Sequence, residues 1–245
     1  MHPNSFGHHI SPSNRFAYTF NNVELSAALK DQRISCIVHH GSVPELSTHA
    51  VIHSHLEGLS VYASRSAGRA GLSVKEFESI LNGQIRNWQQ LGGINEQIEI
   101  GLRGDNVFLQ CSRSILEMHG LNLPAHYCPM SSYGALAEFG RQRRGAILFG
   151  LRTRLADSED LVELMLDGVR VRDVENATYP LSTRVSLILR KSNAESIQLA
   201  RAFAESLVVS GYEDHMEVEV ALLSSSLNEK LQFMESEQMR VHLTA

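Results

Sequence analysis

The side chains best suited to bind a ligand stand where expected strands give way to helices. Arg103 ends an expected strand, residues 97–103, and stands just before an expected helix, residues 106–120. Ligands bind α/β sheets at such strand ends, and a guanidinium grips an oxyanion with two parallel hydrogen bonds. Arg103 is therefore either an anion anchor or part of a structural salt bridge with Asp105 or another carboxylate.

Three more polar residues stand at two expected helix starts. Asn106 is expected to cap the helix after Arg103, with ligand contact as an additional role. Ser131 and Ser132 follow Pro129 and begin the expected helix 131–144, where backbone amides hold anions. Helix capping alone also explains both serines.

Histidine and cysteine residues are the chain's candidates for metal binding and nucleophilic catalysis. His49, His53 and His55 have a spacing that places two ligands on one strand face, but a third ligand for zinc is not identifiable. Cys36 and Cys111 fall inside expected elements and are interpreted as buried small apolar residues. We predict no metal and no cofactor.

No sequence motif indicates catalysis. The chain contains no HExxH, GxSxG, GxxxxGK(S/T) or GxGxxG, and no nucleophile, base and orienting group can be matched. We therefore predict that the protein is not an enzyme.

Composition indicates a folded globular protein of one large domain or two lobes. Hydrophobic residues make up 43% of the 245 residues, charged residues 20%, and the formal net charge is -5. The densest basic cluster, Arg141, Arg143 and Arg144, ends an expected helix, where cations suit the helix dipole. The absence of a basic stripe argues against nucleic acid as a partner.

Cysteine usage and the N-terminal sequence bear on location. Three cysteines form no CxxC pair, which favours a reducing compartment. The first residues do not resemble a secretory signal, and no apolar run is long enough for membrane insertion. The chain as given is expected in the cytoplasm, or in the periplasm if an N-terminal signal is missing from it.

Strand and helix patterns alternate along the chain, which predicts an α/β fold with a mainly parallel or mixed sheet. A β-α-β unit is expected over residues 15–38, followed by two extended runs, residues 49–55 and 58–64, on either side of a break at Glu57-Gly58. Ser73 and Glu76 form a capping-box pattern before a helix that stops at Gly83. The later expected elements are helix 131–144, strands 145–150, 169–174 and 182–191, and helices 193–211 and 228–240.

Two stretches resemble one protein family. "LSVKEFESILNGQIRNWQQLGG", Leu72 to Gly93, with the strand ending at Arg103, resembles a segment of the phosphate-binding, PstS-type solute-binding proteins of ABC transporters. "ATYPLSTRVSLILRK", Ala177 to Lys191, resembles that family's "YPLSRPLYLYV" stretch, and "RRGAILFG" lies between the two in the matching order. Within the first stretch, we expect Trp88 to pack on Phe77 and Leu81.

The resemblance implies a two-lobed, periplasmic-binding-protein-like (type 2) fold, with mixed sheets flanked by helices. Lobe one would hold residues 1–65 and 180–245, and lobe two residues 66–179, joined by a two-segment hinge. A ligand would lie in the cleft between the lobes. Asn21, Asn22 and His40 would face it from lobe one, and Arg103, Asp105, Asn106, Ser131 and Ser132 from lobe two.

The sequence departs from the family at its anion-binding loops. The family's "GSSGG" loop falls on Asn21 to Leu25, which places Glu24 where an anion needs donors. The family's "R-x-D-G-S-G-T" becomes "RGDNVFLQ", so Val107, Phe108 and Leu109 replace its donors. His40 falls near the family's aspartate and is interpreted as an anion donor, a pH sensor or a solvated loop residue.

These observations predict a non-catalytic protein that binds a small oxyanion or polar metabolite, with an ABC permease or a signalling protein as its partner. The alternative is a cytoplasmic sensory or protein-interaction module with a degenerate cleft. An enzyme on the same scaffold ranks last, since no catalytic set of residues is visible.

Overall fold

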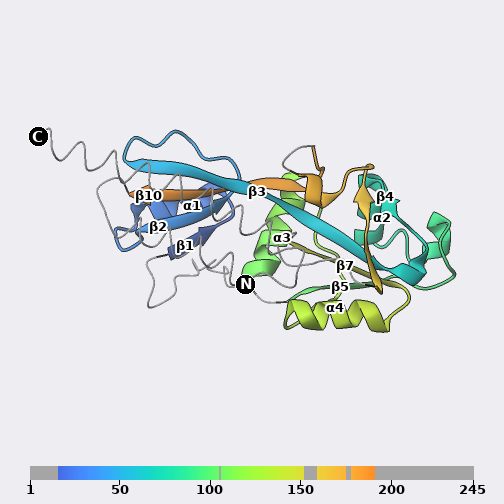
Figure 1. Cartoon of the computed structure of the whole chain (residues 1–245). Coiled ribbons are helices and arrows are strands. Elements are labelled where there is room, and N and C mark those ends of the chain that lie inside the picture. Colours follow the sequence, from blue (N-terminus) through green and yellow to red (C-terminus); the bar gives the residue numbers. More distant parts are fainter. Residues whose placement is uncertain (1–15, 105, 152–158, 175–177, 191–245) are drawn as a thin grey trace, which may run out of the picture. The chain divides into compact units, whose positions relative to one another are not determined.

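A computed structural model describes residues 16–104, 106–151, 159–174 and 178–190 (Figure 1). The helices predicted over 193–211 and 228–240 lie outside the described residues. The chain divides into two units, and among the described residues unit 1 comprises 16–55 with 184–190, and unit 2 the described part of 56–183. The lobe bounds expected from the sequence stay a prediction.

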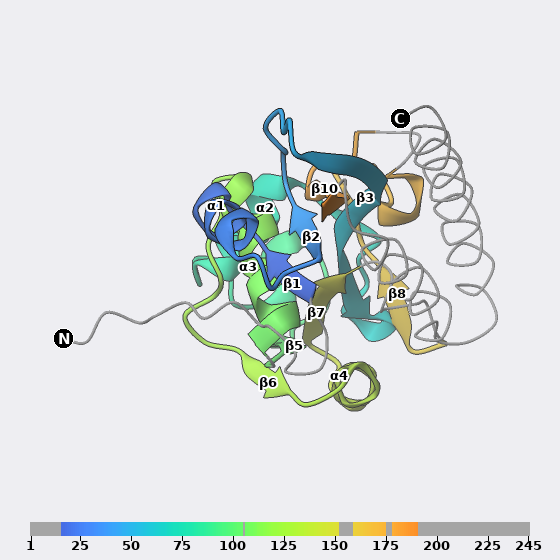
Figure 2. The same cartoon turned by 90° about the vertical axis from the view of Figure 1, so that its left-hand side faces the viewer.

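Unit 1 contains the predicted β-α-β arrangement. Strands β1 (Phe16–Thr19) and β2 (Cys36–His40) pair in parallel, and β10 (Ser182–Arg190) runs antiparallel to β2. Helix α1 (Asn22–Lys30) connects β1 to β2 and packs on both (Figure 2). Its inner face contributes to a small apolar core made of Ala17, Leu25, Ala28, Ile34, Ile37 and Ile188.

Unit 2 is built on a mixed sheet with the strand order β3-β7-β5-β6, whose four strands are labelled in Figure 2. The central pairs β7-β5 and β5-β6 are parallel, whereas β3 runs antiparallel to β7 and to β8. Helices α3 (Asn106–Met118) and α4 (Tyr133–Gln142) pack on β5 and β7. The strands are β3 (His49–Ser64), β5 (Glu99–Arg103), β6 (Cys128–Met130), β7 (Ala146–Leu151) and β8 (Leu161–Glu163).

Smaller elements complete unit 2. A two-stranded parallel sheet joins β4 to β9. The described residues of this unit also form one further α-helix and three short 3-10 helices. Their bounds, with those of the two strands, are η1 (Arg65–Ala67), β4 (Gly71–Leu72), α2 (Val74–Leu81), η2 (Trp88–Leu91), β9 (Met165–Leu166) and η4 (Val171–Asp173).

The capping signals around α2 act as the sequence predicts. The Ser73 side chain accepts from the Glu76 amide at 3.1 Å, and the Glu76 carboxylate accepts from the Ser73 amide at 2.6 Å. Gly83 adopts φ 73°, a left-handed conformation that an L side chain would strain. The helix therefore begins and ends at residues whose local chemistry determines its bounds.

Trp88 lies just after a second cap and is completely buried. The Asn87 side chain accepts from the Gln89 amide at 2.8 Å and starts η2. The Trp88 indole N–H donates to the Gly145 carbonyl at 2.9 Å, 57 residues away in sequence. This bond joins η2 to the start of β7.

One predicted strand boundary is wrong. Residues 49–64 form a single strand, β3, and Gly58 lies inside it rather than in a turn. A Cβ at Gly58 would collide with the Val171 side chain and would contact the Tyr179 ring at 3.4 Å. Gly58 therefore provides room for neighbouring side chains, a use of glycine that resembles a turn signal in the sequence.

The strand predicted over residues 169–174 is also wrong, because Val171–Asp173 form the 3-10 helix η4. The buried Glu163 carboxylate accepts from the Val171 amide at 2.7 Å and from the Arg172 guanidinium at 3.1 Å. The alternating valines predicted a strand, but the backbone donor at Val171 goes to this carboxylate instead of a neighbouring strand.

Candidate functional site in unit 2

Three parallel strands of unit 2 end at one edge of the sheet. Arg103 at the end of β5 stands opposite Met130 at the end of β6, and β7 runs in the same direction beside β5. Helix α3 follows β5, and α4 follows β6, so both helices begin at this edge. Such an edge binds ligands in α/β proteins because strand ends and helix amides converge there.

Arg103 is half-buried at this edge and lies against two aromatic rings. Its guanidinium carbon is 4.8 Å from the centroid of the Phe108 ring and 5.0 Å from that of Tyr133. The two rings meet edge to face, with centroids 5.3 Å apart and planes at 79°. Both rings contact the cation, which restricts its position at the strand end.

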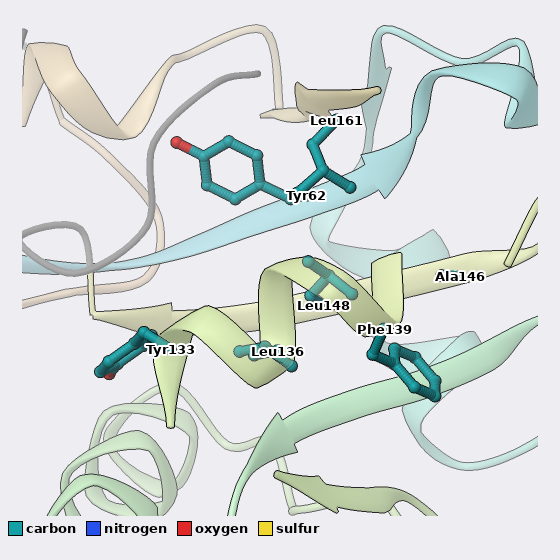
Figure 3. Packing of buried hydrophobic residues seen from close by; sticks show 7 residues of the cluster. All are labelled: Tyr62, Tyr133, Leu136, Phe139, Ala146, Leu148 and Leu161. Atoms are coloured by element: carbon teal, nitrogen blue, oxygen red, sulfur yellow. The ribbon is translucent and has the colours of Figure 1, made fainter. Parts of the chain in front are cut away.

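Tyr133 is the functional candidate that sequence reasoning missed. It begins α4, is 6% exposed, and belongs to the apolar cluster shown in Figure 3. Its hydroxyl is buried and has no hydrogen-bond partner within the described residues, although the Leu151 backbone lies nearby. An aromatic residue at a helix start is typical of core packing, so its position beside Arg103 depends on the tertiary structure.

The electrostatics around Tyr133 combine burial with charges of both signs. Burial raises the pKa of the Tyr133 phenol well above its usual range, and the negative charge of Glu57 adds to that shift. The positive charge of Arg103 and the Leu151 backbone oppose it. The phenol therefore stays protonated at neutral pH and offers a donor. Glu57 is a buried residue of β3 that also contributes to the raised pKa of the buried Cys111 thiol.

The other site residues predicted for this unit lie at or beside the starts of α3 and α4. Ser132 caps α4, with its hydroxyl oxygen accepting from the Ala135 amide at 3.0 Å. Ser131 precedes it and is exposed. Asn106 is the first residue of α3, and Asp105 lies outside the described residues.

The sequence matches no family model and no curated protein. Solved structures do match. An ABC-type phosphate transport receptor from Vibrio cholerae superposes with a TM-score of 0.60 at 18% identity, covering 75% of this chain and 80% of the receptor. PstS from Borrelia burgdorferi has a TM-score of 0.54 at 15% identity, with 74% of this chain and 80% of PstS covered. A phosphate-binding protein from Stenotrophomonas maltophilia has a TM-score of 0.52 at 15% identity, with 84% and 73% covered.

This chain has the fold of the two-lobed periplasmic binding proteins. The fold class expected from the sequence is therefore confirmed. Among the described residues of this periplasmic-binding-protein fold, no helix has the length and apolar character needed to cross a membrane.

The basic cluster at the end of α4 is ion-paired in this fold. Arg141 pairs with Glu138 at 2.9 Å, Arg143 with Glu99 at 3.1 Å, and Arg144 with Glu96 at 3.7 Å. The Arg143 guanidinium also lies 4.4 Å from the centroid of the Phe139 ring. These contacts resemble those of Arg103 but lie at the opposite end of α4.

The residues predicted for lobe one belong to unit 1. Asn21 caps α1 by accepting from the Glu24 amide at 2.9 Å, and Asn22 is the exposed first residue of that helix. His40 ends β2, is buried, and packs its ring on Phe20 with centroids 5.2 Å apart. His40 is therefore not a solvated loop residue, which removes one of its three predicted roles.

Metal ligation has no support in the described part of the chain. No group of three or more histidine, cysteine or acidic residues lies close enough there to hold a metal ion. The His49 ring contacts the Thr48 hydroxyl at 2.9 Å. His53 and His55 are further residues of β3.

His39, beside His40, is a buried titratable group at the end of β2. Its Nδ1 lies 2.9 Å from the Thr19 hydroxyl, and its Nε2 lies 3.3 Å from the Ser42 carbonyl. Burial lowers the pKa of His39, while the Ser42 carbonyl, Glu24 and Thr19 partly oppose this shift. The contacts fit a neutral ring that donates to Ser42 and accepts from Thr19.

Unit 1 is expected to lose stability as the pH falls below the ordinary histidine pKa. The lowered pKa of His39 means that the unfolded chain binds its proton more readily. The stabilisation that neutral His39 contributes is therefore complete above the pKa of His39 in the unfolded chain. It declines as the pH falls toward the lower pKa of His39 in the folded protein. Urea unfolding from neutral to mildly acidic pH should show a shallower decline for His39→Asn, which keeps an acceptor for Thr19.

The control for this prediction is His126→Gln, which removes an exposed histidine of unit 2. An unchanged pH dependence in His39→Asn, or an equal change in His126→Gln, would contradict the assignment to His39.

Proposed function

We propose that this protein is a non-catalytic ligand-binding protein that binds a small oxyanion or polar metabolite at the carboxyl ends of β5, β6 and β7. The observation that carries the proposal is the guanidinium of Arg103, held by the Phe108 and Tyr133 rings at the edge where α3 and α4 begin. The fold of the matched structures supports a ligand-binding role.

Three physical effects favour the binding of an anion at this edge of the sheet. A guanidinium offers parallel N–H groups to two oxygens of one anion. The helix starts add partial positive charge from backbone amides. The ring contacts restrict Arg103 before binding, so less side-chain freedom is lost when a ligand arrives.

Two of the three thiols, those of Cys36 and Cys111, do not suit nucleophilic catalysis. Burial raises the pKa of Cys36 and Cys111, and both stay protonated at neutral pH. Because the thiolate is the reactive form, neither is an activated nucleophile. A binding role without chemistry is consistent with these values.

Arg103→Gln is expected to weaken anion binding at least about tenfold, since a hydrogen-bonded charge contributes about 1.5–3 kcal/mol. Thermal shift and calorimetry on the whole chain would use phosphate, sulfate, molybdate and a panel of carboxylate metabolites. In wild type, a ligand at a hundred times its dissociation constant should stabilise the fold by about 2.7 kcal/mol.

Arg143→Gln is the matched control, because Arg143 also contacts a ring of α4 but lies at the opposite end of that helix. It should leave binding unchanged. Equal affinity in Arg103→Gln and wild type would rule out Arg103 as the anchor. Lack of a shift with every compound would overturn the binding role.

A further inference from the structure

Asn82 and Gly83 form the one Asn-Gly dipeptide of the chain, and they stand at the end of α2. In such a dipeptide the glycine amide nitrogen can attack the carbonyl carbon of the asparagine side chain, because glycine has no Cβ to obstruct the approach. The Asn82 side chain is exposed, so water reaches it. The end of α2 therefore combines the two residues and the access to water that deamidation requires.

The folded backbone keeps the two reacting groups apart. Asn82 has ψ 4°, which turns the Gly83 nitrogen toward the backbone nitrogen of Asn82 and away from its side chain. The Gly83 N–H donates to the Ile80 carbonyl at 3.0 Å, and the Asn82 N–H donates to the Glu78 carbonyl at 3.0 Å. Ring closure requires rotation about this bond and loss of the Gly83 hydrogen bond. The reaction therefore requires the last turn of α2, residues 78–82, to open.

The Asn82 side chain itself stabilises this last turn. Oriented so that its amide nitrogen faces carbonyl groups, it donates to the Ser79 carbonyl at 2.9 Å and to the Glu78 carbonyl at 3.2 Å. An ionised aspartate in this place could not donate to either oxygen. It would also add a negative charge at the negative end of the helix dipole, four residues after Glu78. Deamidation would thus replace two hydrogen bonds by an unfavourable charge.

We propose that Asn82 is a deamidation site, that opening of the last turn of α2 limits its reaction, and that the product weakens the helix end. In the opened turn the Gly83 nitrogen bonds to the side-chain carbonyl carbon of Asn82 and gives up its proton, and the side-chain nitrogen leaves as ammonia. The succinimide then takes up water at either ring carbonyl and opens to aspartate or isoaspartate. Water is consumed, ammonia is released, and nothing is oxidised or reduced.

Peptide mass spectrometry of the whole chain in guanidinium chloride, at mildly alkaline pH, tests the site. Asn82 should convert faster than Asn95 and Asn122, which are exposed in the folded chain. Each of these controls precedes a residue with a side chain, Glu96 or Leu123, which obstructs the attacking nitrogen. If either control converts as fast as Asn82, the assignment of the site is overturned.

The same measurement without denaturant tests the dependence on opening. Conversion of Asn82 should be at least about tenfold slower in the folded chain than in guanidinium chloride at the same pH. Ser73→Ala removes the cap at the start of α2 and should accelerate conversion in the folded chain. Ser132→Ala, which removes the corresponding cap of α4, is the matched control and should not. Equal rates in folded and denatured chain, or equal acceleration by both variants, would contradict control by α2.

Asn82→Asp reproduces one of the two products and should lower the midpoint of urea unfolding. Asn95→Asp is the matched control, since it adds the same charge to unit 2. The Asn95 side-chain oxygen accepts from the Asn87 side-chain amide at 3.0 Å, a hydrogen bond that a carboxylate retains. This control should therefore keep the wild-type midpoint. A wild-type midpoint in Asn82→Asp would overturn the predicted effect of the product on the helix end.

Discussion

Trp88→Ala is expected to destabilise unit 2 by about 3–5 kcal/mol, the usual range for removing a buried tryptophan from a core. Trp88 is fully buried, and its indole N–H donates to the Gly145 carbonyl at 2.9 Å. The substitution leaves a cavity and removes the bond that joins η2 to the start of β7. Urea unfolding followed by far-ultraviolet circular dichroism would measure the loss.

Two controls separate the cavity from the hydrogen bond. Trp88→Phe retains most of the apolar volume and should lose about 1–2 kcal/mol, because the Gly145 carbonyl still accepts from the Glu99 amide at 3.1 Å. Gln89→Ala changes an exposed neighbour in η2 and should have little effect. A loss below about 1 kcal/mol for Trp88→Ala would mean that this side chain does not anchor unit 2. Because Trp88 is the only tryptophan, wild-type fluorescence follows unit 2 specifically.

Gly145→Ala is expected to destabilise the same region by about 3 kcal/mol, the upper part of the range for overpacking. A Cβ at Gly145 would collide with the Gln97 carbonyl oxygen, a backbone atom that cannot rotate away. Relief requires separation of the segments that hold Gln97 and Gly145, which strains the Trp88 and Glu99 hydrogen bonds to the Gly145 carbonyl. The midpoint of unfolding in urea would report the loss.

Gly134→Ala is the matched control, since a Cβ at Gly134 meets only the Ser132 hydroxyl oxygen at 3.8 Å, an ordinary contact. Gly134 lies in α4, where alanine is favoured over glycine by about 1 kcal/mol. This variant should therefore be neutral or more stable. Equal stability of Gly145→Ala and wild type would show that the two segments separate without penalty.

Both destabilised positions lie away from the candidate site. Gly145 precedes β7, whereas Arg103 stands at the carboxyl end of β5, which runs parallel to β7. At temperatures where the variants remain folded, ligand affinity should therefore match that of wild type. A selective loss of affinity in these variants would indicate coupling along the strands.

Short-range chemistry was readable from the sequence. The Ser73 and Glu76 capping box, the left-handed Gly83 and the buried strand 146–151 need only neighbouring residues and the periodicity of apolar side chains. The order of two motifs along the chain indicated the periplasmic-binding-protein fold, which the matched structures confirm. Local conformational preferences are readable because a few neighbouring residues determine each of them, and the order of the motifs is read directly along the chain.

Contacts between distant segments required the tertiary structure. Gly58 looked like a turn because a missing Cβ has the same sequence signature in a turn and beneath a neighbouring side chain. Val171 looked like part of a strand because its amide partner, Glu163, is identified only by the fold.

In the candidate site, too, some features were predictable from the sequence and others required the tertiary structure. The sequence placed Arg103 at a strand end, and this position is correct. It did not bring Tyr133 to Arg103, because Arg103 ends β5 whereas Tyr133 follows β6, and the two residues meet only because these strands pair in parallel. Sequence alone determined the positions of the charged group and the helix starts. Only the tertiary structure decided the apolar rings around the charge, because which side chains share a strand end depends on sheet order.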